Sequence, residues 1–259
     1  MKIALAQMDV FLGNPKKNFE KVQQFVIQAA EKKADLVVFP EMWNTGYALS
    51  ALTTIADVDG RLTQEKLSKW AKENQISIVA GSVATQTSGK FYNCSYSFDA
   101  SGNLVSTYNK VHLFGPMNEE KFIQSGTKEN VFELNGILSS AVICYDLRFP
   151  EWIRTNMAKG PEILYVVAQW PKERIEQWKI LLQARAIENQ AFVVAVNRVG
   201  KDQNNQFDGH SLVVNPLGKI ILACGVNEGL QLVDIDPSEV MRVRGQIPVF
   251  EDRRVELYH

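Results

Sequence analysis

Cysteine is scarce in this chain of 259 residues. The three that occur, Cys94, Cys144 and Cys224, lie far apart and form no C-x-x-C pair. This spacing argues against a disulfide framework or a structural zinc site and is typical of proteins in a reducing compartment. The N-terminus also lacks an apolar segment that ends at a small-residue cleavage site, so nothing there predicts secretion. We therefore expect a cytoplasmic protein.

An excess of charge of one sign and long hydrophobic runs are also absent. The chain carries 28 basic and 29 acidic residues, so its bulk charge offers no surface for nucleic acid or for an anionic membrane. No apolar run approaches the ~20 residues that cross a bilayer. Because 46% of the residues are hydrophobic, a chain of this length can bury a large core. We expect neither nucleic acid nor a membrane as a partner.

Apolar, β-prone runs alternate with helical patterns along most of the chain. The expected strands cover residues 3–10, 35–40, 76–84, 91–98, 104–108, 131–134, 137–144, 162–170, 191–198, 209–215, 220–223 and 231–235. The expected helices begin after Asn14 and near Pro150 and cover 63–74, 174–189 and 238–244. No linker or clear repeat interrupts this order. The pattern predicts one α/β domain over residues 1–259, with mixed sheets covered by helices and an irregular tail at 247–259.

Cys144 ends one of these strands, and a polar turn and a helix start follow it directly. The positive end of a helix dipole can favour the thiolate, which is the nucleophilic form of cysteine. The alternative is a buried structural cysteine, because free cysteine is among the most buried residue types. Glu41 and Lys110 follow two other strands. Each alone is typical of solvated surface, but sites in α/β sheets gather beyond strand ends, so the three could converge.

In this order, the three positions stand in segments similar to those of a known family. The segments are residues 39–41, 108–113, 144–151, 184–189, 209–211 and 247–250. Over nearly its full length the chain resembles the nitrilase superfamily of carbon–nitrogen hydrolases, and within it the Nit-type ω-amidase branch. The resemblance implies a four-layer αββα sandwich, a homodimer, and a catalytic triad of Glu41, Lys110 and Cys144. It also implies a small-molecule amide substrate and no metal or organic cofactor.

The implied reaction explains why these residue types are needed. Glu41 would take the thiol proton of Cys144 and return it to the departing ammonia, and we expect burial to raise the pKa of Glu41 for this exchange. Lys110 would stabilise the thiolate and the tetrahedral oxyanion, with the backbone N–H of Tyr145 as a second donor. A thioester would result, and water activated by Glu41 would hydrolyse it.

The same resemblance suggests further residues of the site. Many family members orient the substrate with a second glutamate after the lysine. Glu119 matches best by spacing and Glu120 is the alternative, although an exposed pair of loop glutamates is equally consistent. Arg148 would bind a substrate carboxylate, unless it forms a structural salt bridge. The candidate walls of a small pocket are Tyr47, Phe114, Tyr145 and Trp170.

These assignments favour the ω-amide of a small dicarboxylic acid, such as 2-oxoglutaramate, as the substrate. Nitrilase, N-carbamoyl hydrolase and deaminated-glutathione amidase activities are alternatives within the family. Gln169 leaves the acyl-group preference open, because some relatives carry Asn before Trp-Pro. A Cys-His hydrolase that uses His112 or His210 is a rival mechanism. A non-catalytic binding module is the remaining alternative, although its expected mark, a lost triad residue, is absent from the sequence.

Overall fold

The computed structural model describes residues 1–202 and 204–258. Its strands are β1 (Lys2–Gln7), β2 (Leu36–Val38), β3 (Asp57–Val58), β4 (Ser77–Val79), β5 (Val83–Thr87), β6 (Lys90–Phe98), β7 (Leu104–Asn109), β8 (Val131–Leu134), β9 (Ile137–Ile143), β10 (Ile163–Ala168), β11 (Phe192–Asn197), β12 (Val199–Lys201), β13 (Gln206–Asp208), β14 (Leu212–Val214), β15 (Ile220–Ala223) and β16 (Gly229–Asp234). Its helices are α1 (Pro15–Glu31), α2 (Leu52–Ile55), α3 (Arg61–Asn74), α4 (Pro150–Met157), α5 (Ile175–Asn189) and α6 (Ser238–Gln246). None of the helices described is both long enough and apolar enough to cross a membrane.

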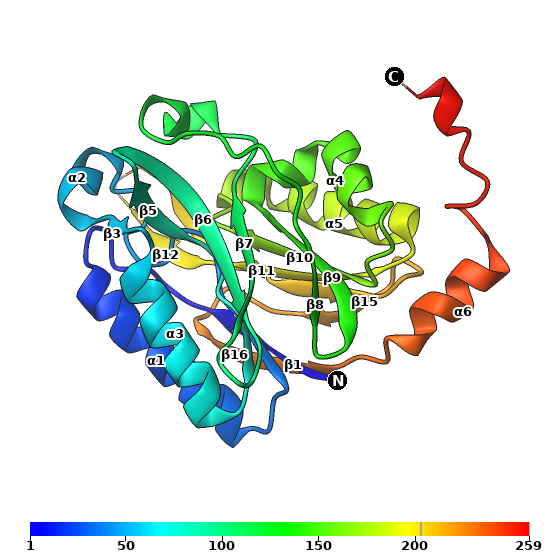
Figure 1. Ribbon diagram of the computed structural model, residues 1–259, viewed down its shortest axis with the longest axis horizontal. Helices are drawn as coiled ribbons and strands as arrows, with labels where there is room; N and C mark the ends of the chain where they lie inside the picture. Colours follow the sequence, from blue (N-terminus) through cyan, green and yellow to red (C-terminus); the bar gives the residue numbers. More distant parts are fainter. Residues whose placement is uncertain (203, 259) are drawn as a thin grey trace.

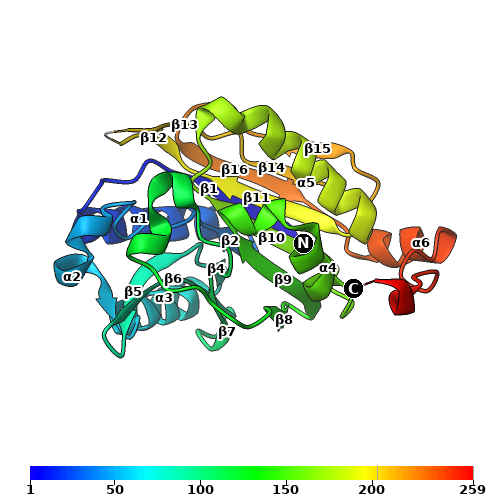
Figure 2. The ribbon, with the colours of Figure 1, turned by 90° about the horizontal axis from the view of Figure 1, so that it is seen from above.

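Two β-sheets face each other between two layers of helices (Figure 1). The eight-stranded sheet has the order β16-β1-β2-β4-β6-β5-β3, with β7 paired to β6, and the six-stranded sheet has the order β15-β14-β11-β10-β9-β8. Helices α1 and α3 cover the outer face of the first sheet, and α4 and α5 cover that of the second (Figures 1 and 2). Both sheets mix parallel and antiparallel pairs. The four-layer αββα sandwich predicted from the sequence is confirmed.

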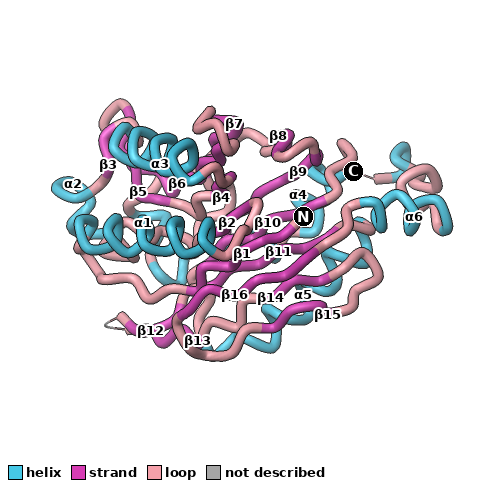
Figure 3. The backbone as a smooth tube through the Cα atoms, turned by 90° about the horizontal axis from the view of Figure 1, so that it is seen from below, coloured by secondary structure: helices cyan, strands magenta, loops and turns pink. Residues whose placement is uncertain are grey.

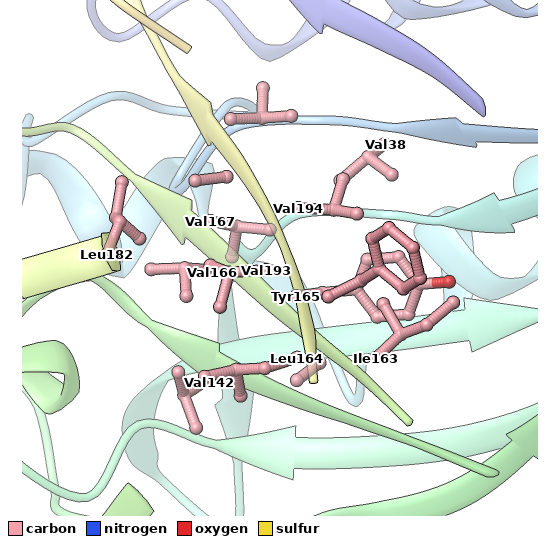
Figure 4. Packing of buried hydrophobic residues seen from close by; sticks show 14 of the residues in the cluster. Val38, Val142, Ile163, Leu164, Tyr165, Val166, Val167, Leu182, Val193 and Val194 are labelled. Carbon is pink, nitrogen blue, oxygen red and sulfur yellow. The ribbon is translucent and has the colours of Figure 1, made fainter. Parts of the chain in front are cut away.

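The central strands are apolar on both faces because a helix layer covers one face and the other sheet covers the second. β1 lies between β16, which runs antiparallel to it, and β2, which runs parallel (Figure 3). Successive side chains of a strand point to opposite faces. Ile3 and Val38 accordingly belong to the core between the sheets, whereas their neighbours Ala4 and Val37 belong to the core beneath α1 and α3. Figure 4 shows Val38 in the shared core with side chains of β9, β10 and β11.

The single strand predicted over residues 76–84 is wrong, because the chain divides into β4 and β5 around Gly81. Gly81 has φ +66°, and a side chain there would place its Cβ 1.9 Å from the carbonyl oxygen of Pro40. Only glycine allows so close a backbone approach. Because Pro40 precedes Glu41, this approach supports the segment that carries a predicted site residue. The short elements α2, β3, β12 and β13 were not predicted, since each is too brief to show a periodic pattern.

Helix α6 and the segment after it extend away from the sandwich (Figures 1 and 2). This C-terminal tail, residues 247–258, is mostly irregular. Phe250 contacts the body of the protein, with the guanidinium carbons of Arg154 and Arg244 each 5.0 Å from its ring centroid. Ile247, at the start of the tail, is 60% exposed. The tail therefore carries apolar surface that the described residues do not cover.

Candidate active site

Three side chains that follow different strands meet in the interior. Glu41 lies beyond β2, Lys110 directly after β7, and Cys144 directly after β9. Lys110 Nζ donates a hydrogen bond of 2.8 Å to Glu41 Oε1, and both side chains are fully buried. Cys144 is 6% exposed and lines a cavity, and the charges of Glu41 and Lys110 both act on its thiol. The structure thus brings together the three residues singled out in the sequence.

Cys144 occupies a sharp turn between β9 and a short 3₁₀ helix, Cys144–Arg148. Its φ is +47°, an uncommon conformation for a residue with a side chain, and one that often accompanies functional sites. The buried carboxylate of Asp146 holds this turn. It accepts hydrogen bonds from the Ile143 N–H at 3.0 Å, the His112 N–H at 2.9 Å and the Tyr108 hydroxyl at 2.7 Å. Three hydrogen bonds to Asp146 therefore hold the turn that presents the thiol.

The two oxygens of Glu41 have different surroundings. Oε1 accepts three hydrogen bonds, from the Tyr47 hydroxyl at 2.7 Å, from Asn93 Nδ2 at 2.8 Å and from Lys110 Nζ at 2.8 Å. Oε2 accepts one, from the backbone N–H of Gln169 at 2.8 Å. A carboxylate oxygen that accepts three hydrogen bonds has little capacity left. Oε2 is therefore the oxygen that can still accept a proton.

A second carboxylate completes the cluster. Glu119 is buried, and its Oε2 accepts hydrogen bonds from Lys110 Nζ at 2.7 Å and from the Phe114 N–H at 2.8 Å. Asn93 Nδ2 donates to Glu119 Oε1 at 3.0 Å as well as to Glu41, so one amide bridges the two acids. Glu120 is exposed. Of the two glutamates that the sequence left open, the structure places Glu119 beside the lysine.

The pKa shifts of the charged groups follow from this packing. Burial by itself would raise the pKa of Glu41, but the charge of Lys110 and the hydrogen bonds from Lys110, Tyr47 and the Gln169 N–H together lower it. The expectation of a raised Glu41 pKa is therefore wrong, because sequence alone does not reveal these donors. Burial would lower the pKa of Lys110, yet the Glu119 and Glu41 carboxylates raise it. Burial raises the pKa of Glu119, aided by Glu41 and opposed by Lys110.

The thiol behaves differently from the sequence-based expectation. We expected the following helix to favour the thiolate of Cys144. Instead, burial and then the charge of Glu41 raise the pKa of Cys144 well above its usual value, although Lys110 opposes them. A helix dipole stabilises a nearby anion by about 0.3–1 kcal/mol at a surface. This is less than the destabilisation of the thiolate by burial and by a neighbouring carboxylate. At neutral pH the site holds a neutral thiol next to an ionised glutamate.

Cys144 opens onto a narrow cavity. All four predicted wall residues line it, namely Tyr47, Phe114, Tyr145 and Trp170. Arg148 lines it as well. Met117 and Arg174 are also part of the lining, and the sequence analysis did not assign them to the pocket.

Arg148 does not form the structural salt bridge that was its alternative role. No carboxylate of the described residues lies within ion-pair distance of its guanidinium. The group instead lies over the Trp170 ring, with Cζ 4.8 Å from the ring centroid, and donates to Gln177 Oε1 at 2.5 Å. A stacked guanidinium of this kind keeps its charge available to a ligand.

Neither histidine named in the rival mechanism lines the cavity. Nδ1 of His112 is 2.8 Å from Asp146 Oδ1, and its ring stacks on Phe149 with centroids 3.7 Å apart. The backbone carbonyl of His210 accepts from Trp178 Nε1 at 2.9 Å. A general base must reach the proton it abstracts, directly or through one water. This arrangement favours packing roles for both histidines.

Sequence reasoning missed Asn93 and the way Gln169 contributes. Asn93 lies in β6 as a buried polar residue, and its Oδ1 has no hydrogen-bond partner among the described residues. A buried polar residue in a strand core is a signal in principle, but burial is not visible in one sequence. Gln169 holds the site through its backbone N–H and through Nε2, which donates to the carbonyl oxygen of Glu41 at 2.8 Å.

The fold and this buried acid, amine and thiol define an enzyme that hydrolyses carbon–nitrogen bonds. Residues 2–245 match the family described as "Carbon-nitrogen hydrolase". The chain belongs to this family, and the resemblance to the nitrilase superfamily is confirmed.

Two curated relatives and one solved structure illustrate the relationship. The chain is 45% identical over 256 residues to "2-oxoglutaramate amidase" of Bacillus subtilis (strain 168). This match covers 99% of this chain and 98% of the relative. It is 31% identical over 267 residues to an omega-amidase of Homo sapiens. That match covers 99% of this chain and 96% of the human protein. The structure of XC1258 from Xanthomonas campestris, described as a CN-hydrolase superfamily protein with an arsenic adduct in the active site, superposes with a TM-score of 0.91 at 30% identity. That match covers 98% of this chain and 97% of the other.

Proposed function

We propose that this enzyme hydrolyses the ω-amide of a small dicarboxylic acid, with 2-oxoglutaramate as the leading substrate and 2-oxoglutarate and ammonia as products. The observation that carries the proposal is a cavity lined by both Cys144 and Arg148, whose guanidinium has no carboxylate partner among the described residues. An amide that also bears a carboxylate needs both groups. The name of the relative from Bacillus subtilis supports the same substrate.

In the first half-reaction, Glu41 acts as the general base. The Cys144 thiol passes its proton to Glu41 Oε2, the oxygen with free capacity, while sulfur attacks the amide carbon. Lys110 Nζ and the Tyr145 N–H stabilise the negative charge on the carbonyl oxygen. The carbon–nitrogen bond then breaks, Glu41 returns the proton to nitrogen, and ammonia leaves. The acyl group remains on sulfur as a thioester.

In the second half-reaction, water replaces ammonia. Glu41 takes a proton from the water as its oxygen attacks the thioester carbon, and the carbon–sulfur bond breaks. The proton returns to sulfur, and the acid and the free thiol are regenerated. Atoms and charge balance without a metal or an organic cofactor. A general base typically contributes 10²–10⁴ to such a step.

The other predicted residues have supporting roles. Glu119 holds Lys110 in place and orients the substrate amide, a role consistent with the two hydrogen bonds that its Oε2 accepts. Arg148 binds the substrate carboxylate. Tyr145 and Trp170 form apolar walls, and Trp170 also supports the Arg148 guanidinium.

We propose that residues 1–259 act as a single catalytic domain in a cytoplasmic homodimer. The reactive thiol of Cys144 needs a reducing compartment. The C-terminal tail carries exposed apolar residues, including Ile247 and Leu257, which a second copy would cover. Sedimentation of the chain truncated before Ile247 tests the contact: the proposal expects a shift toward monomer, and unchanged assembly would refute a tail-mediated dimer.

A panel of substrates tests the activity. Ammonia release from 2-oxoglutaramate is compared with release from a nitrile, a carbamoyl amino acid and deaminated glutathione. We expect 2-oxoglutaramate to give the highest kcat/KM, with activity abolished by Cys144→Ala and retained by Cys224→Ala, which removes a thiol outside the cavity. A preference for the nitrile, the carbamoyl compound or the glutathione derivative would replace the proposed substrate. Binding without turnover of any of them would favour a non-catalytic module.

A further inference from the structure

The cavity contains a second guanidinium, that of Arg174. This residue immediately precedes α5 and lines the same cavity as Cys144 and Arg148. Its Cζ lies 5.3 Å from the ring centroid of Phe114, as that of Arg148 lies 4.8 Å from Trp170. Two arginines thus each rest on an aromatic wall of one small pocket.

Neither guanidinium is neutralised within the part of the chain that the structure describes. No carboxylate lies within ion-pair distance of Arg148 or Arg174. The nearby acids Glu41 and Glu119 both pair with Lys110. Two positive charges are therefore left for whatever enters, which is costly for a pocket that binds only neutral molecules.

The position of Arg174 is fixed by the backbone. Trp170 Nε1 donates to the Arg174 carbonyl oxygen at 2.8 Å, and the Arg174 N–H donates to the Pro171 carbonyl oxygen at 3.1 Å. The indole that supports the Arg148 guanidinium therefore also anchors the main chain of Arg174. A preorganised pair of donors loses less entropy on binding than two free side chains would.

We propose that Arg174 determines specificity by forming, with Arg148, a two-guanidinium clamp for the 2-oxo acid end of the substrate. This inference rests on the proposed function. A 2-oxo acid presents a carboxylate and an adjacent carbonyl oxygen, all of which are hydrogen-bond acceptors. An α-amino acid amide such as glutamine presents an ammonium group at the same carbon, which two guanidinium groups repel. The clamp selects the oxo acid amide against the amino acid amide.

The test compares three amides of similar length: 2-oxoglutaramate, glutamine and neutral pentanamide. For Arg174→Gln we expect kcat/KM for 2-oxoglutaramate to fall about 10- to 100-fold, mainly through KM, because a charge-assisted hydrogen bond is lost. Turnover of pentanamide should stay within about twofold, and the preference for 2-oxoglutaramate over glutamine should shrink. Arg174→Lys, which keeps the charge but not the planar fork, should recover only part of the loss. The matched control is Lys179→Gln, which removes a cation on α5 outside the cavity.

The outcomes separate this inference from the proposed function. If the wild-type enzyme prefers 2-oxoglutaramate and Arg174→Gln keeps that preference, the role of Arg174 is refuted and the proposed function stands. An equal loss on pentanamide would show a structural role and would also refute it. If the wild-type enzyme hydrolyses pentanamide as well as 2-oxoglutaramate, the proposed function and the clamp both fail.

Discussion

Replacement of Glu41 by glutamine tests the centre of the mechanism. The substitution keeps the size of the side chain but removes the base and one of the two carboxylates that pair with Lys110. Because the proposed mechanism uses Glu41 in both half-reactions, we expect kcat/KM to fall by about 10³ or more, which corresponds to about 4 kcal/mol of transition-state stabilisation. A steady-state assay of ammonia release measures this loss.

The same substitution should also destabilise the fold by a limited amount. Removing one partner of a buried ion pair costs about 3–5 kcal/mol. The lower value applies here, because Glu119 still lies 2.7 Å from Lys110 Nζ. For a chain of this size, about 3 kcal/mol lowers the melting temperature by roughly 6–12 °C. The variant should therefore remain folded at 25 °C, so the activity loss is not explained by unfolding.

Two further variants show which role of Glu41 matters. Glu119→Gln removes the other carboxylate from Lys110 but leaves the base, so we expect a similar loss of stability and a smaller loss of rate. Glu120→Gln changes an exposed neighbour and should alter neither. Equal rate losses for Glu41→Gln and Glu119→Gln would mean that Glu41 is a charge partner only. Survival of more than about a tenth of the activity in Glu41→Gln would refute the base and reopen the histidine mechanism.

The remaining predictions concern the bridging amide and the three thiols. Asn93→Leu removes the hydrogen-bond donor that Glu41 and Glu119 share. We therefore expect at least a tenfold loss of kcat and a shifted pH–rate profile. If the role of Asn93 were only structural, the substitution would lower only the melting temperature. Burial raises the pKa of Cys94 to about 12 and that of Cys224 to about 11, and the pKa of Cys144 is raised as well, so access and a neighbouring base decide which thiol reacts. Iodoacetamide followed by peptide mass analysis should label Cys144 first, because it lines the cavity next to Glu41 whereas the other two thiols lie outside the cavity; equal labelling would contradict the site. The free energy of unfolding should fall as the pH rises above 9, because the thiols of the unfolded chain then lose protons that those of the folded chain retain. Each such thiol lowers it by about 1.4 kcal/mol per pH unit. The slope of the free energy of unfolding against pH, measured between pH 9 and 10 for the wild type and for Cys94→Ala, isolates the contribution of one thiol. Identical slopes would contradict the raised pKa of Cys94.

Much of the fold could be predicted because its signals are local. Asn14 caps α1 by accepting the Lys17 N–H at 3.2 Å, and Pro15 opens the helix, as the sequence pattern indicates. The continuous apolar strands likewise predict burial on both faces. The interruption at Gly81 could not be predicted, because it depends on the carbonyl of Pro40, which follows β2 and is distant in sequence. Local patterns do not report such tertiary contacts.

The site was predictable in its composition and less so in its electrostatics. Glu41, Lys110 and Cys144 follow strands, and family resemblance gave their order along the chain. The direction of the Glu41 pKa shift was predicted wrongly, because it depends on donors from Tyr47 and Gln169 that only the folded chain brings together. Arg174 was missed for a related reason: a charged residue at a helix start is ordinarily solvated, and no pattern places it in a cavity.

The charges around the thiol determine when it becomes a nucleophile. With Glu41 ionised and the Cys144 pKa raised, moving the thiol proton to Glu41 before the substrate arrives would transfer the negative charge from a carboxylate that accepts four hydrogen bonds to a buried sulfur. During attack, by contrast, the proton neutralises Glu41 while the negative charge moves from sulfur to the carbonyl oxygen. The proposed donors Lys110 and the Tyr145 N–H then stabilise the charge on the carbonyl oxygen, so it does not have to rest on a buried sulfur. Proton transfer and carbon–sulfur bond formation are therefore expected to occur together, so the resting enzyme carries a protected thiol that an amide in the cavity activates.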